Sequence, residues 1–227
     1  MLNRAASLVF GGSCFLCRGG STGTLCDECN HDLPRLAKPR CPRCALASPA
    51  GAVCGRCLSE APRYDATLAA LAYAFPADAL IHAFKFRGEL ALAPLISRLL
   101  LEEIPASSRV DLVVPVPLSA KRLRERGYNQ ALEIARPLAA RIGAPLDFAA
   151  CERTRETPPQ TELPWAERAR NVRGGFRCTR ALAGATVAVV DDVMTTGATL
   201  DEIAGTLKAA GAARVINWVV ARTPPPA

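Results

Sequence analysis

The residues Asp191–Leu200 carry the groups best suited to chemistry: two adjacent carboxylates, three threonines and a glycine. They follow the apolar run Thr186–Val190, which predicts a buried strand, and they precede the helix-like segment Leu200–Ala210. A helix N-terminus offers free backbone N–H groups and a partial positive charge, so the intervening turn is suited to bind a phosphate. Gly197 would let the backbone approach the anion, and paired carboxylates can accept hydrogen bonds from the vicinal hydroxyls of a ribose. The stretch therefore predicts a site for a sugar phosphate.

Other phosphate-binding loops do not match this stretch. A Walker loop requires a lysine after its last glycine, and none follows Gly197, while a dinucleotide fingerprint requires three glycines. The remaining alternative is an ordinary strand–turn–helix with threonine caps and early acidic residues. Two adjacent aspartates with three threonines exceed what capping requires, so a ligand site is favoured.

Eight of the ten cysteines form four C-x-x-C pairs. Each pair can offer two thiolates to a tetrahedral Zn²⁺, so the sequence predicts two structural zinc ions. Sequential pairing, with the first two pairs on one ion and the last two on the other, is the simplest arrangement, but the spacing also permits an interleaved one. The pairs are Cys14/Cys17, Cys26/Cys29, Cys41/Cys44 and Cys54/Cys57.

Redox dithiols and iron–sulfur ligation are the alternative interpretations of these pairs. A secreted disulfide scaffold is disfavoured, because the apolar run Ala5–Phe10 is too short for a signal peptide. Cys151 and Cys178 stand alone and are expected to be packing or surface residues. No apolar stretch reaches the length of a membrane helix without a charge or a proline, so we expect a soluble, cytoplasmic protein without membrane insertion.

The chain is basic, with a formal net charge of +7. Residues 119–180 contain 13 Lys and Arg against 7 Asp and Glu, which predicts an anionic ligand near this region. Pyrophosphate, a nucleotide and a nucleic acid are the candidates.

The pattern along the chain predicts two domains, a cysteine module at residues 1–61 and an α/β domain at residues 62–227. Strands are expected at Ala66–Phe75, Val110–Pro117, Thr186–Asp192 and Arg214–Ala221, with a possible short one at Pro145–Ala149. Helical patterns lie between them at Ala77–Ile104, with interruptions near Lys85–Gly88 and Pro94, and at Ala120–Ile142 and Ala198–Ala210. Alternating strands and helices imply a parallel sheet flanked by helices. The proline-rich segment Ala150–Gly175 has no apolar period and is expected to be a long loop that acts as a mobile lid.

The Asp191 stretch resembles the loop that binds phosphoribosyl pyrophosphate (PRPP) in type I phosphoribosyltransferases. Further motifs occur in order: Phe84–Gly88, Val114–Pro117, Arg126–Gln130, and the run from Arg153 through Arg168 to Phe176. Together with the cysteine module, they resemble the ComF family of competence-associated phosphoribosyltransferase-like proteins. The resemblance implies a type I phosphoribosyltransferase-like fold preceded by a double zinc ribbon.

The resemblance also implies roles for single residues. Asp191 and Asp192 would meet the ribose hydroxyls, and the phosphate would be held by Thr195, Thr196, Gly197, Ala198 and Thr199. Lys85 and Arg87 are either an exposed helix edge or cationic contacts to the ligand. Pro117 and Arg126 would face the pyrophosphate end. The residues expected to contribute to catalysis are Asp191, Asp192, Arg168 and Lys85.

Two functions follow from these expectations. The first is an enzyme that binds PRPP with Mg²⁺ and transfers the phosphoribosyl group to an acceptor that the sequence does not name. The second is a non-catalytic protein of DNA uptake that binds PRPP, a nucleotide or single-stranded DNA. Single-stranded DNA and helicase-type competence proteins are the expected macromolecular partners.

Overall fold

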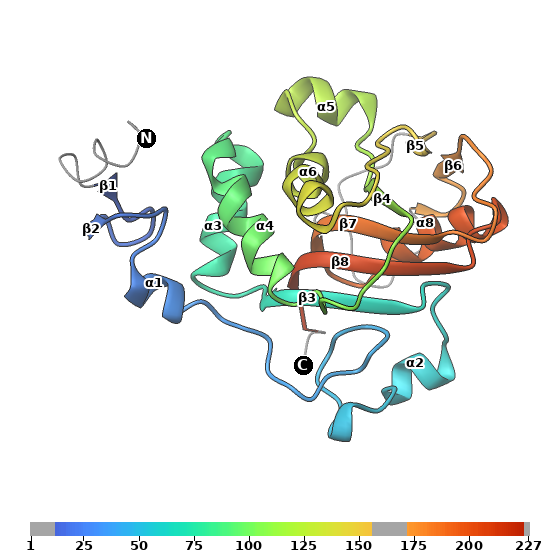
Figure 1. The fold of residues 1–227 in the computed structure, drawn as a ribbon, viewed down its shortest axis with the longest axis horizontal. Coiled ribbons are helices and arrows are strands. Elements are labelled where there is room, and N and C mark those ends of the chain that lie inside the picture. The colour runs from blue at the N-terminus through green and yellow to red at the C-terminus, as the bar shows by residue number, and fades with distance from the viewer. Residues whose placement is uncertain (1–11, 156–171, 225–227) are drawn as a thin grey trace.

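A four-stranded parallel sheet forms the centre of the computed structural model, which describes residues 12–155 and 172–224 (Figure 1). The strands lie in the order β3, β8, β7 and β4, spanning Ala66–Ala72, Arg214–Arg222, Thr186–Met194 and Leu112–Pro115. The two central strands are apolar along most of their length, as expected for parallel strands covered on both faces. The predicted α/β class and parallel sheet are therefore confirmed.

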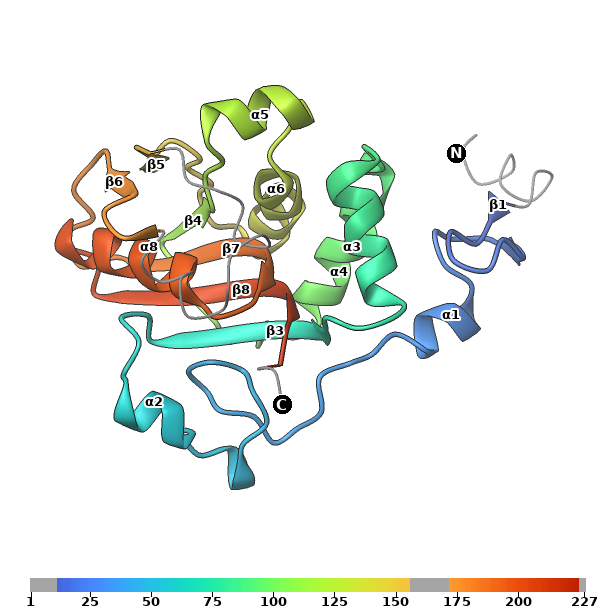
Figure 2. The ribbon, with the colours of Figure 1, turned by 180° about the vertical axis from the view of Figure 1, so that it is seen from behind.

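Helices cover both faces of this sheet. On one face lie α3 (Ala77–Phe86), α4 (Ala93–Leu101) and α6 (Gln130–Ile142), and on the other lies α8 (Ala198–Ala209), as Figure 2 shows from behind. Each face of the sheet has its own apolar core, and alternating residues of β7 belong to one or the other. Ala188 and Val190 pack with α3, α4 and α6, whereas Val187 and Val189 pack with α8.

The expected helix Ala120–Ile142 is wrong as a single element. The chain forms α5 (Ala120–Arg126) and then α6, because Gly127 adopts a left-handed conformation with φ 79° that ends α5. Asn129 starts α6 by accepting hydrogen bonds from the amides of Ala131 and Leu132. The helical segment Ala77–Ile104 shows the interruptions expected near Lys85–Gly88 and Pro94. Helix α3 ends at Phe86, and the short 3-10 helix η3 (Leu90–Leu92) separates it from α4, whose second residue is Pro94.

Part of the expected loop Ala150–Gly175 is regular structure. Strand β5 (Cys151–Arg153) pairs antiparallel with β6 (Phe176–Cys178), which brings the two lone cysteines into register. The sequence did not predict these strands because each has only three residues, too few to show an alternating pattern, and because they pair across a long stretch of chain. The expected strand Pro145–Ala149 is reduced to a single bridge between Leu146 and Val113 of β4. Residues 156–171 of the expected lid lie outside the described residues.

The cysteine region divides into two modules that contact different parts of the sheet domain. The first cysteine module, residues 12–32, contains β1 (Gly12–Ser13), β2 (Gly20–Ser21) and α1 (Asp27–His31) and lies beside α3 and α4. The second, residues 41–59, contains the 3-10 helix η2 (Pro49–Gly51) and α2 (Gly55–Ser59) and lies along β3. The boundary at residue 61 stays a prediction.

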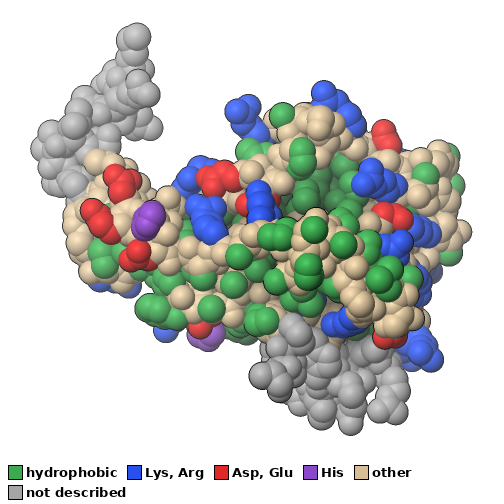
Figure 3. Space-filling view, turned by 90° about the horizontal axis from the view of Figure 1, so that it is seen from below, with side chains coloured by type: hydrophobic (Ala, Val, Ile, Leu, Met, Phe, Trp, Pro, Cys, Tyr) green, Lys and Arg blue, Asp and Glu red, His purple; other side chains and the backbone are tan. Residues whose placement is uncertain are grey.

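The segment between the modules adds hydrogen bonds to the free edge of the sheet. Ala72 donates to the carbonyl of Pro34 at 2.7 Å and Leu36 donates to that of Ala70 at 3.3 Å, so residues 34–36 run antiparallel along β3. Seen from below, acidic side chains gather on the first module, whereas Lys and Arg are spread over the rest of this face (Figure 3). Within the described residues, no helix has the length and apolar character needed to cross a membrane.

Candidate functional site

The eight paired cysteines form two clusters of four, and the pairing is sequential. Within each cluster the Sγ atoms all lie within 4.8 Å of one another; Cys17 and Cys26 are 3.8 Å apart, and Cys44 and Cys54 are 3.6 Å apart. Four sulfurs bonded tetrahedrally to zinc at about 2.3 Å would be separated by about 3.8 Å. The interleaved arrangement is thereby excluded, and the donor sets fit two structural Zn²⁺ ions.

The backbone around the clusters favours thiolates. Burial raises the pKa of Cys14 and Cys41, but backbone hydrogen bonds to their sulfurs outweigh it and lower the two pKa values to about 6 and about 7. In the same clusters, neighbouring cysteines raise the pKa of Cys29 to about 12. Four thiolates at this spacing repel one another, so the full set needs a cation, and Zn²⁺ provides it.

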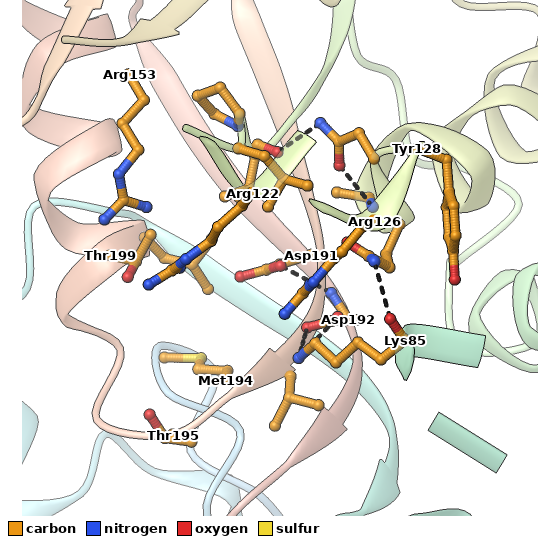
Figure 4. Close-up of a pocket in the computed structure, with 18 of the residues that line it drawn as sticks. Lys85, Arg122, Arg126, Tyr128, Arg153, Asp191, Asp192, Met194, Thr195 and Thr199 are labelled. Atoms are coloured by element: carbon orange, nitrogen blue, oxygen red, sulfur yellow. Dashed lines mark hydrogen bonds and ion pairs between the residues drawn. The ribbon is translucent and has the colours of Figure 1, made fainter. Parts of the chain in front are cut away.

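A cavity of about 580 Å³ opens at the carboxyl ends of β4 and β7 (Figure 4). Ligand sites in open parallel sheets occur at this edge. Its walls come from the end of α3, the segment between β4 and α5, α5 itself, the start of α6, the end of β5, and the end of β7 with the turn to α8. The charged residues in its lining are Lys85, Arg122, Glu125, Arg126, Arg153, Asp191 and Asp192. Four cations and three carboxylates thus meet in one cavity of the size that ligands occupy.

The two adjacent aspartates differ in their surroundings. Lys85 pairs with Asp192 through both carboxylate oxygens, at 2.9 and 2.8 Å, and Asp192 is 6% exposed. Burial, and then the neighbouring Asp192 charge, raise the pKa of Asp191 to about 7. An uncharged Asp191 can donate a hydrogen bond and an ionised one can only accept, so this carboxyl is poised between two states near neutral pH.

The turn after the aspartates has the geometry of an anion site. Strand β7 extends two residues beyond its expected end, to Met194, and Gly197 begins α8 with φ 88°. A Cβ at Gly197 would lie 2.7 Å from Met194 Cε and 3.1 Å from the Tyr64 hydroxyl, so the positive φ and the close neighbours both favour glycine there. Thr195, Gly197, Ala198 and Thr199 line the cavity, next to the N-terminus of α8.

Three arginines face the carboxylates across the cavity, as Figure 4 shows. We call them the arginine wall: Arg122, Arg126 and Arg153. Arg126 donates to Gln130 Oε1 at 3.0 Å and lies over the Phe86 ring, 5.0 Å from its centroid. Burial, and then the nearby Arg122, lower the pKa of Arg153. A bound polyanion would relieve this repulsion. Pro117 also lines the cavity.

Two expected site residues do not line the cavity, and a third is not described. Arg87 is exposed at the end of α3 and does not line the cavity, so we leave it out of the proposed ligand site. The buried Thr196 directs its hydroxyl to its own turn, where it accepts a hydrogen bond from the Ala198 amide at 3.2 Å. Arg168 lies outside the described residues.

Sequence reasoning did not assign the aromatic residues around the cavity, or the arginine behind the turn, to the site. Tyr73 and Phe86 contribute aromatic surface to the cavity, and Tyr128 donates to the Phe84 carbonyl beside it. Behind the turn lies the buried Arg222, whose only sequence signal is a charge at the end of the apolar run Val215–Ala221.

Two domain models match the chain. The double zinc ribbon domain matches residues 5–58, and the phosphoribosyl transferase domain matches residues 129–225. Among solved structures, one described as the allosteric regulatory enzyme of purine biosynthesis gives a TM-score of 0.39 at 23% identity, covering 57% of this chain and 25% of that chain.

Curated relatives match almost from end to end. The DNA utilization protein YhgH of Escherichia coli strain K12 is 37% identical over 95% of this chain and 99% of its own length. Competence protein F of Haemophilus influenzae is 30% identical over 92% of this chain and 96% of its own. Competence protein ComFC of Streptococcus pneumoniae is 24% identical, covering 87% of each chain. With a double zinc ribbon, a phosphoribosyl transferase domain and these full-length relatives, the chain belongs to the ComF family.

Proposed function

We propose that the cavity binds PRPP and that the protein transfers its phosphoribosyl group to an acceptor. The observation that carries this proposal is the meeting, in one cavity, of the Asp191–Asp192 pair, the Gly197 turn and an arginine wall. The three features match the three parts of PRPP: a ribose with vicinal hydroxyls, a 5-phosphate and a pyrophosphate.

Each part of PRPP has a place in this arrangement. The 5-phosphate would lie at Thr195–Thr199, against the N-terminus of α8. The ribose hydroxyls would donate to Asp191 and Asp192, and the pyrophosphate would extend toward Arg122, Arg126 and Arg153.

The two carboxylates also fit a Mg²⁺ site, because Mg²⁺ is bound through one or two carboxylates together with substrate phosphates. When bound, Mg²⁺ would neutralise charge on the pyrophosphate. Lys85 holds the carboxylate that the sugar would use, so ligand binding requires its ammonium group to share Asp192 or to move toward the anion.

The reaction would be a displacement at the anomeric carbon of the ribose. A C–N bond to a nitrogen nucleophile forms as the C–O bond to pyrophosphate breaks, and the electron pair leaves with pyrophosphate. The chain's residues position the sugar, neutralise the leaving group and exclude water, so no covalent intermediate with the protein is required.

The second candidate is binding of a nucleotide or of single-stranded DNA without turnover. Its support is the aromatic surface at the cavity: Phe86 is 59% exposed and Tyr73 is 38% exposed, beside Arg126. Exposed rings next to arginines suit stacked bases. The names of the relatives, which concern DNA utilization and competence, agree with a role in DNA uptake.

A pyrophosphate-release assay with PRPP, Mg²⁺ and a panel of bases and amines tests turnover, while calorimetry tests binding. Asp192→Asn should weaken PRPP binding by roughly 1.5–3 kcal/mol, the value of a charge-assisted hydrogen bond. Asp65→Asn is the matched control, because Asp65 also pairs with a lysine, Lys208 at 2.8 Å, but does not line the cavity. Equal PRPP affinity in the parent and both variants would refute the assignment, and affinity without pyrophosphate release would favour the second candidate.

A further inference from the structure

The back of the phosphate-binding turn is held by the second cysteine module. Arg222, at the end of β8, is 1% exposed, and its guanidinium donates to four backbone carbonyls. One is the carbonyl of the cluster residue Cys44, at 2.8 Å, and two are those of Met194, at 2.9 Å, and Thr195. One buried side chain therefore joins a cysteine cluster to the turn that begins the proposed phosphate site.

A second arginine extends the same contact by one residue. Arg56 lies between Cys54 and Cys57 on α2, and its Nη2 donates to the carbonyl of Thr196 at 3.0 Å. Three consecutive carbonyls, from residues 194, 195 and 196, thus accept hydrogen bonds from two arginines, one at the end of β8 and one in the second cysteine module. Tyr64, which is 4% exposed, packs in the same core as Ala45 of the module and Met194 of the turn.

The direction of these carbonyls has a consequence for the amides that follow them. In a trans peptide, the C=O of one residue and the N–H of the next point in opposite directions, and none of these three peptides is cis. Carbonyls turned toward Arg222 and Arg56 therefore turn the N–H groups of Thr195, Thr196 and Gly197 away from these two arginines, and Thr195 and Gly197 line the cavity. Successive N–H groups with this orientation form an anion-binding nest.

The first cysteine module has no such connection. Among the described residues, the hydrogen bonds of residues 12–32 all stay inside the module, and its cluster packs against the apolar core of the α3 and α4 face.

We propose that Arg222 and Arg56 are positioning residues that orient the amides of the phosphate-binding turn, and that the second cysteine cluster, but not the first, holds them in place. Metal occupancy at Cys41, Cys44, Cys54 and Cys57 then determines anion affinity in the cavity. This inference rests on the proposed function for its ligand, but not for the coupling between the cluster and the turn.

The chain offers a matched pair of variants. Cys26 and Cys54 occupy equivalent positions, since each begins the second pair of its cluster and is the N-cap of the short helix that follows. Cys26→Ser and Cys54→Ser should each lose one of two zinc ions, measured by elemental analysis. In the full-length protein without ligand, Cys54→Ser should speed amide hydrogen exchange of residues 195–199 by tenfold or more, and Cys26→Ser should leave it unchanged.

PRPP affinity, measured by calorimetry with Mg²⁺, should follow the same division. Cys54→Ser should weaken it by at least tenfold, and Cys26→Ser should leave it within twofold of the parent. Because Cys54→Ser could unfold more than the turn, Arg56→Ala provides a milder test: we expect a weakening of roughly three- to tenfold with both zinc ions retained. Arg56→Lys, which keeps a cationic donor, should restore part of the affinity, a rescue that a purely structural role would not predict.

The outcomes separate the coupling between the cluster and the turn from the proposed function. Faster exchange and weaker binding confined to the second-cluster and Arg56 variants support the proposal. Equal effects of the two cysteine variants, or no effect of Cys54→Ser on the turn, overturn it. If the parent binds no PRPP while exchange still separates the two clusters, the coupling stands and the proposed function fails.

Discussion

Two clusters with the same four ligands have different neighbours in this protein. The first, at Cys14, Cys17, Cys26 and Cys29, lies in a module that makes no hydrogen bond to another described part of the chain and carries Asp27 and Glu28 on its helix. The second is joined through Arg222 and Arg56 to the turn at the cavity. Equal metal chemistry therefore does not imply equal roles, because what a structural metal controls depends on what its ligand backbone touches.

The largest expected difference between the clusters is in stability. Cys44→Ser should destabilise the sheet domain by more than about 4 kcal/mol, because Cys44 is buried and its carbonyl accepts from the buried Arg222. Cys17→Ser removes an exposed ligand and should leave the main unfolding transition unchanged. Chemical denaturation followed by circular dichroism measures both, and similar losses in the two variants would break the comparison.

The next prediction concerns the turn that the second module supports. Gly197→Ala should cost about 2–3 kcal/mol, because it combines a positive φ with a Cβ 2.7 Å from Met194 Cε. Gly143→Ala is the control, since Gly143 has φ 71° but open space around it, and it should cost about 1 kcal/mol. Thermal unfolding separates the two costs, and equal values would show that the contact with Met194 relaxes freely.

A smaller effect follows from Asp191. Its folded-state pKa of about 7 lies above the ordinary 3.8, so the folded protein binds a proton more readily than the unfolded chain, and stability falls as pH rises from about 4 to about 7. Asp191→Asn removes this cost and should stabilise the protein at pH 8 by on the order of 1–2 kcal/mol, with little effect at pH 4, while weakening PRPP binding. Denaturation curves across this range test it; a variant less stable than the parent at pH 8 would contradict the raised pKa.

The smallest effects concern nucleic acid. If single-stranded DNA binds at α5, which contributes Arg122 to the cavity, the logarithm of its affinity should fall with the logarithm of the salt concentration. The slope should be roughly 0.7 per phosphate neutralised. Replacing Lys121, Arg122 and Arg124 together should lower both affinity and slope. Arg18→Ala in the acidic first module should change neither. Fluorescence anisotropy at several salt concentrations measures this, and binding that ignores salt would exclude an electrostatic contact.

The sequence was sufficient for features that are local or strongly periodic. The apolar runs predicted β7 and β8 to within two residues, and the cysteine spacing predicted two four-ligand clusters. It failed where long-range contacts decide. The pairing of β5 with β6 and the ion pair between Lys85 and Asp192, 107 positions apart, leave no periodic signal. Arg222 could have been noticed as a charge after an apolar strand, but its four acceptors are known only once the strand is placed.

The segment at residues 34–36 has a consequence for how such proteins can be recombined. It covers the outer edge of β3, and residues 145–147 cover the outer edge of β4, where Val113 exchanges hydrogen bonds with Pro145 and Asp147. Other segments of the chain therefore form hydrogen bonds to both edge strands of the sheet, and this protects against edge-to-edge aggregation. In a chimaera joined at residue 61, the edge of β3 would be covered by residues 34–36 of a different protein. Chimaeras between relatives should therefore keep residues 34–36 and β3 from the same parent.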